Sequence, residues 1–127
     1  MRRAVSSESA PAAIGPYSQA IRAGAFLFLS GQIPLDPRTG IMVAGDVAAQ
    51  THQVFANLQA ILTAGGATFD NVVRTTVYLA DMNDFGAVNE VYGAYFSSPA
   101  PARATVQAAR LPKDARVEID MVAHVGD

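Results

Sequence analysis

Arg103 and Glu118 are the two residues whose types and positions point most directly to chemistry. Arg103, Thr105 and Gln107 alternate with small apolar residues, so their side chains share one face of a predicted strand. Glu118 lies opposite the apolar residues of the last predicted strand, so we expect Arg103 and Glu118 to project together from a helix-free sheet face. An arginine fork binds a carboxylate and a glutamate can activate water, which suits a reaction on a carboxylate-bearing substrate.

The same two residues have a simpler interpretation. An arginine and a glutamate on a solvated sheet face also form an ordinary surface ion pair, which contributes little to stability. Strand spacing alone does not choose between a surface ion pair and a substrate site, so both interpretations stay open at this point.

Other reactive groups are few. The chain has no cysteine, which excludes disulfides, thiolate ligands and a thiol nucleophile. His52 and His124 do not match any zinc-binding spacing, and we assign them no role. No glycine-rich phosphate loop is present. We therefore expect neither a metal nor a cofactor.

The hydrophobic pattern predicts two helices and at least five strands. Apolar residues recur at three- and four-residue spacing over 47–64, after the N-cap candidate Asp46 and before Gly65. A second helical stripe contains Phe85, Val88, Tyr92, Tyr95 and Phe96, and we assign its aromatic residues to the core rather than to base stacking. The predicted strands are 18–24, 26–33, 72–79, 102–108 and 116–125.

This order of elements predicts an α+β fold in two layers. Residues 18–24 and 26–33 form a hairpin, and both helices pack on one face of a mixed sheet, which leaves the other face open. The length of 127 residues fits a single domain spanning 1–127.

Composition limits the classes of partner. Half of the residues are hydrophobic and only 16% are charged, so we expect an oligomer that covers apolar surface. The net charge of -2 gives no basic surface for nucleic acid. No secretory signal is visible, and the longest apolar run, 25–29, is too short to span a bilayer. The expected location is the cytoplasm.

Several segments resemble signatures of the reactive-intermediate deaminase (RidA) family, which is YjgF-type and also named endoribonuclease L-PSP. The resemblance covers about residues 6–125. The segments are APAAIGPYSQA at 10–20, FLSGQIP at 28–34, DMNDF at 81–85 with Asn89 and Tyr92, PARATV at 101–106, LPKD at 111–114 and VEI at 117–119.

The resemblance implies a chorismate-mutase-like fold, a homotrimer and three active sites between subunits. It implies hydrolysis of 2-iminobutanoate, 2-iminopropanoate and related enamines or imines from pyridoxal-phosphate enzymes, such as 2-aminoacrylate, to 2-keto acids and ammonia. No cofactor, nucleic acid or membrane is implied as a partner. Because an imine is already electrophilic, positioning and one acid–base group suffice for hydrolysis.

The resemblance also implies roles for particular residues. Arg103 would hold the substrate carboxylate, the backbone amide of Thr105 would add a hydrogen bond, and Glu118 would position or activate water. The further pocket residues would be Tyr17, Ser30, Gly31 and Asn89. Some members carry cysteine where this chain has Thr105, but a contact through the backbone does not depend on that side chain.

Two other functions stay open at this stage. The same trimer would serve as a non-catalytic module that binds keto acids or other small metabolites, or as a ribonuclease and translation inhibitor. The acidic net charge argues against the ribonuclease.

Overall fold

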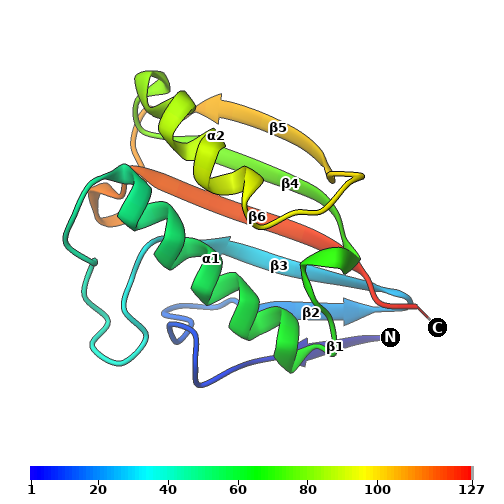
Figure 1. Cartoon of the computed structure of the whole chain (residues 1–127). Helices are drawn as coiled ribbons and strands as arrows, with labels where there is room; N and C mark the ends of the chain where they lie inside the picture. Colours follow the sequence, from blue (N-terminus) through cyan, green and yellow to red (C-terminus); the bar gives the residue numbers. More distant parts are fainter. Residues whose placement is uncertain (127) are drawn as a thin grey trace.

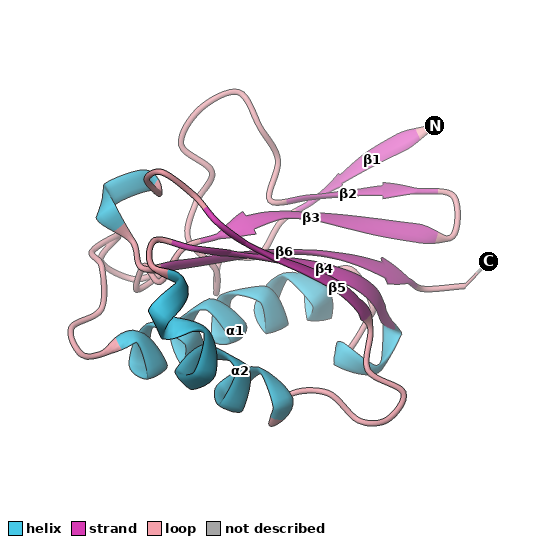
Figure 2. Cartoon of the chain, turned by 90° about the horizontal axis from the view of Figure 1, so that it is seen from above, coloured by secondary structure: helices cyan, strands magenta, loops and turns pink. Residues whose placement is uncertain are grey.

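The computed structural model describes residues 1–126, in which two helices cover one face of a six-stranded sheet (Figures 1 and 2). The strands are β1 Arg2–Val5, β2 Ala20–Ala23, β3 Phe26–Gln32, β4 Val72–Leu79, β5 Ala102–Gln107 and β6 Val117–His124. Their order across the sheet is β1-β2-β3-β6-β4-β5. Among the strands of residues 1–126, only the β4–β5 pair is parallel, so the predicted mixed sheet of an α+β fold is confirmed.

Helix α1, Val47–Ala64, has the bounds that its apolar spacing predicts. The Asp46 side chain accepts a hydrogen bond of 2.9 Å from the amide of Ala49, which satisfies one of the free N–H groups of the first turn. The buried face of α1 packs on β3 and β6. Its buried apolar residues are Val47, Val54, Phe55, Leu58, Ile61 and Leu62.

Helix α2, Phe85–Gly93, ends three residues earlier than the apolar stripe predicts. Tyr95 and Phe96 lie beyond its end but still pack against the core. They surround the fully buried Phe55, whose ring stacks on Tyr95 at 4.2 Å between centroids. The assignment of these aromatic residues to the core is confirmed, and the helix ends where Gly93 weakens helix propensity.

One strand was not predicted, and another is irregular. Strand β1 was not predicted, because this four-residue edge strand buries only Val5. In β4 the register shifts between Val72 and Arg74, and Val73 remains exposed there. This irregularity puts Val72, rather than Val73, among the buried residues of β4.

The sheet face opposite the helices stays open, as predicted (Figure 2). It carries large apolar side chains at Phe26, Phe28 and Val106, with 40 to 46% of each exposed. Within residues 1–126, no helix is long and apolar enough to cross a membrane.

Asn57 ties the chain that leaves β3 to helix α1. Its side chain is fully buried, and Nδ2 donates to the carbonyl oxygens of Ile33 at 3.3 Å and Leu35 at 3.0 Å. We expect Asn57→Ala to lower the free energy of unfolding by about 2 kcal/mol, because buried carbonyls lose their donor. The exposed control Gln59→Ala should change it by less than about 0.5 kcal/mol in urea titrations at one protein concentration. Equal effects of the two substitutions would contradict this role of Asn57.

Candidate active site

Arg103 faces the helix layer, so the prediction that it points away from the helices is wrong. Its register partner on β4 is Thr75, which is fully buried and hydrogen-bonds to Tyr92 of α2. Nη1 of Arg103 donates to Oδ1 of Asn89, also on α2, at 2.8 Å. The small apolar residues of β5 indicated the wrong face because β5 is an edge strand, whose alternating positions are not sorted by burial.

The Arg103 guanidinium lies against side chains of α2. Its Cζ atom is 4.7 Å from the ring centre of Tyr92 and 5.6 Å from that of Phe85. Together with the hydrogen bond to Asn89, these contacts fix the direction of the guanidinium. A guanidinium has five N–H donors, so others remain to bind a carboxylate.

The backbone amide of Thr105 points to the free edge of β5. The amide of Ala108 donates to the carbonyl of Leu79 on β4 at 2.8 Å, and amides of successive residues in a strand point to opposite sides. The N–H of Thr105 is therefore directed away from β4, on the side where no strand follows. The hydroxyl of Thr105 is buried, without a hydrogen-bond partner among the described residues.

Glu118 projects from the open face, as predicted. Its register partner is Tyr78, and its neighbours Val117 and Ile119 are fully buried on the helix side. The half-buried carboxylate packs directly against Gly31, where a Cβ atom would overlap Oε2 of Glu118. Gly31 thus allows the Glu118 side chain to approach the backbone closely, whereas Gly31 was predicted only as a pocket residue.

The pairing of strand β3 with β6 is irregular beside Glu118. The register with β6 shifts between Leu29 and Gln32, so Ser30 and Gly31 together stand opposite Asp120. The hydroxyl of Ser30 donates to the carbonyl of Ser18 at 2.6 Å. Ser30 therefore ties the loop before β2 to the irregular part of β3.

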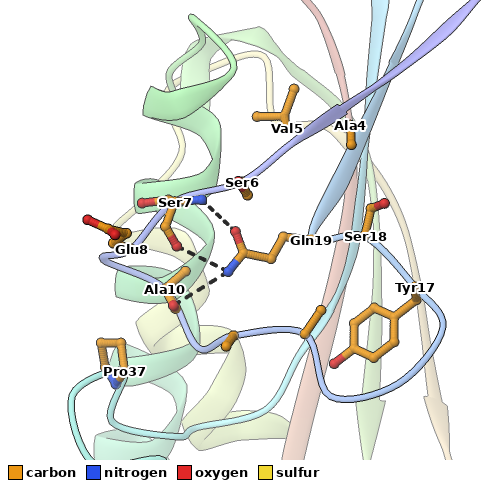
Figure 3. Close-up of a pocket in the computed structure, with 12 residues that line it drawn as sticks. Ala4, Val5, Ser6, Ser7, Glu8, Ala10, Tyr17, Ser18, Gln19 and Pro37 are labelled. Carbon is orange, nitrogen blue, oxygen red and sulfur yellow. Dashed lines mark hydrogen bonds between the residues drawn. The ribbon is translucent and has the colours of Figure 1, made fainter.

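Tyr17 lies on this loop, whose start is held by the buried Gln19 (Figure 3). The Gln19 side chain accepts from the amide of Ser7 at 2.6 Å and donates to the carbonyl of Pro11 at 2.8 Å. Tyr17 is 53% exposed and lines a cavity of about 290 Å³ with Gly31. The cavity also has apolar walls, which include Ile14, Ile33, Leu35 and Pro112.

The surroundings of Glu118 change its acidity. Burial raises the pKa of the Glu118 carboxyl above its usual range, and the negative charge of Asp120 raises this pKa further. Asp120 is held in place by the hydroxyl of Tyr78, which donates to Oδ2 at 3.0 Å. A carboxyl group that titrates closer to neutral pH is suited to proton transfer.

The structure thus divides the predicted site residues into two groups. One group lies around the C-terminal end of β3 and the open face, and contains Tyr17, Ser30, Gly31 and Glu118. The other group contains Asn89, Arg103 and Thr105 at the β5 edge beside α2. Arg103 and Glu118 project from opposite faces of the sheet, so the two groups do not converge within one chain.

Three further residues contact or act on the predicted site residues, and the sequence did not predict this role for them. Phe85 and Tyr92 flank Arg103, and Asp120 acts on Glu118. Phe85 and Tyr92 lie four and three residues from Asn89, a spacing that places all three on one side of a helix. Asp120 follows Glu118 by two residues, so the strand period puts both carboxylates on one face.

Known proteins resemble this chain over almost its whole length. Residues 7–125 match the protein family described as Endoribonuclease L-PSP. The mouse protein named 2-iminobutanoate/2-iminopropanoate deaminase is 52% identical over 126 residues, which cover 99% of this chain and 93% of the mouse protein.

Solved structures show the same fold. The structure of RidA from an Antarctic Psychrobacter bacterium superimposes with a TM-score of 0.92 at 43% identity, covering 96% of this chain and 98% of that one. The structure of E. coli TdcF with bound serine gives a TM-score of 0.91 at 41% identity, with the same coverage. The signature segments, the fold and these relatives agree, and the chain belongs to the RidA family.

Proposed function

We propose that this protein is a 2-iminobutanoate/2-iminopropanoate deaminase that works as a homotrimer. The observation that carries the proposal is that one edge of the chain offers a complete carboxylate-binding group, while the open face offers an acid–base group. The mouse relative at 52% identity has this activity in its name. The TdcF structure holds serine, which carries a carboxylate of the kind that Arg103 would bind.

A second copy of the chain would bring the two groups together. The open face exposes Phe26, Phe28 and Val106, which favours its burial against another subunit. In a cyclic trimer each subunit would place its β5 edge, with Arg103, beside the open face and Glu118 of its neighbour. Each boundary between subunits would then contain one complete site.

The two groups suit hydrolysis of an imine. Arg103 and the amide of Thr105 hold the substrate carboxylate, which positions the adjacent C=N carbon beside Glu118. Glu118 accepts a proton from water as the water oxygen bonds to this carbon and the C=N double bond becomes single. The proton passes from Glu118 to nitrogen, which completes an amino alcohol. Glu118 then accepts the proton of its hydroxyl and donates it to the amino nitrogen, the C–N bond breaks, and ammonia leaves as the C=O bond of the 2-keto acid forms.

A coupled assay tests this function directly. A dehydratase supplies 2-iminobutanoate, and decay of the imine is followed with and without the protein. We expect wild type to accelerate the decay and Arg103→Ala to lower kcat/KM by about 100-fold, because the carboxylate loses a charge-assisted anchor. Glu118→Gln should lower kcat by at least about 100-fold, the usual range for acid–base catalysis.

Arg22 provides a matched control for Arg103. Its Nε donates to the carbonyl of Gly24 at 2.7 Å in the turn between β2 and β3, at the opposite end of β3 from Gly31, so Arg22→Ala should retain wild-type kcat/KM. Undiminished turnover by Glu118→Gln would remove this carboxylate from the mechanism. A folded wild-type protein that binds 2-ketobutanoate without accelerating imine decay would instead support the non-catalytic binding function.

The pH dependence tests the state of Glu118. Glu118 acts as a base only when ionised, so kcat/KM should fall as pH decreases through its raised pKa. Asp120→Asn removes a negative charge that raises this pKa, and the acid limb of the profile should therefore move to lower pH. The exposed control Asp70→Asn should leave the limb in place. An acid limb that stays fixed or moves to higher pH in Asp120→Asn would contradict this assignment.

A further inference from the structure

Three residues of α2 form one continuous surface under Arg103. Phe85, Asn89 and Tyr92 are spaced by four and three residues, so they lie on the same side of the helix. Each contacts the Arg103 side chain, the two aromatic rings through their faces and Asn89 through its amide oxygen. Helix α2 therefore both packs on this part of the sheet and contacts the Arg103 side chain directly.

Tyr92 is the immobile part of this surface. It is only 6% exposed, and its ring packs against Phe96 at 4.8 Å and Phe55 at 5.8 Å between centroids. Its hydroxyl forms a buried hydrogen bond of 2.7 Å with the hydroxyl of Thr75. Thr75 is also the register partner of Arg103, so one point on β4 fixes both the aromatic ring and the strand that carries the arginine.

We propose that Tyr92, locked by its hydrogen bond to Thr75, is a positioning residue that presets the Arg103 guanidinium for the substrate carboxylate. This inference rests on the proposed function, because it explains how the carboxylate-binding group is held ready. A free arginine side chain loses considerable rotamer freedom when it binds a ligand, and a guanidinium already lying on a fixed ring loses less. Tyr92 does not reach the reacting carbon and acts through Arg103 alone.

A positioning role of Tyr92 predicts a specific change in the kinetic constants. The carboxylate is bound equally in the ground state and the transition state, so loss of its preset anchor raises KM and leaves kcat nearly unchanged. We expect Tyr92→Leu to raise KM about 10-fold, within the range that a desolvated cation–π contact supports. Tyr92→Phe keeps the ring but loses the hydrogen bond to Thr75, so its KM should lie between wild type and Tyr92→Leu, about 3-fold above wild type.

Tyr95→Leu is the matched control for loss of an aromatic ring. Tyr95 belongs to the same cluster and stacks on Phe55 at 4.2 Å, but it has no contact with Arg103 among the described residues. This substitution should lower the melting temperature and leave KM unchanged. Equal KM changes in Tyr92→Leu and Tyr95→Leu would show a general packing effect and overturn the proposal.

A second measurement keeps the proposal testable without turnover. Protons of Arg103 that lie over the Tyr92 ring should show upfield-shifted NMR signals in wild type and smaller upfield shifts in Tyr92→Phe, which keeps the ring but loses the hydrogen bond to Thr75. The shifts should be lost in Tyr92→Leu. Thr75→Val keeps the shape of the Thr75 side chain and removes the hydroxyl that bonds to Tyr92. It serves as the test if Tyr92→Leu does not fold, and it should reduce the shifts and weaken 2-ketobutanoate binding. Arg103 signals that are the same in all folded variants would overturn the positioning role, whereas an inactive wild type with the expected shifts would overturn only the proposed function.

Discussion

Side chains alternate between the two faces of a sheet, and this constraint determines where the active site can form. The register of β5 on β4 places Arg103 beneath the helix layer, next to Thr75. The register of β6 on β4 places Glu118 on the other face, next to Tyr78. No side-chain rotation can bring these two groups together across the sheet, so a site that uses both requires a second chain.

The two groups of site residues are prepared in different ways. Arg103 is oriented by its contacts with the Tyr92 ring and the Asn89 side chain of α2. Glu118 is adjusted by its surroundings, since burial and Asp120 both raise its pKa. Gly31, in the irregular part of β3, leaves room for this carboxylate. The hydrogen bond from Ser30 to Ser18 holds the loop that contains Tyr17 in the same region.

Periodicity predicted most of the fold because burial sorts the residues of central elements. Helix α1 and strands β4 and β6 bury one face against the core, and apolar residues recur at the buried positions of their sequences. Strands β1 and β5 lie at the two sheet edges, where burial is slight and the pattern carries little information. For that reason β1 was missed and Arg103 was assigned to the wrong face. The resemblance to the RidA family predicted the candidate site residues, but their division between two faces required the structure.

The central claim is that Arg103 of one subunit meets Glu118 of another, and mixed trimers test it most directly. Arg103→Ala and Glu118→Gln subunits with different affinity tags are co-expressed, and trimers that carry both tags are purified and tested for imine hydrolysis. In every cyclic trimer that carries both tags, one of the three boundaries pairs an intact Arg103 with an intact Glu118, so activity should rise to about one third of wild type, far above that of either variant alone. Mixed trimers that remain as inactive as the two parent variants would contradict the account.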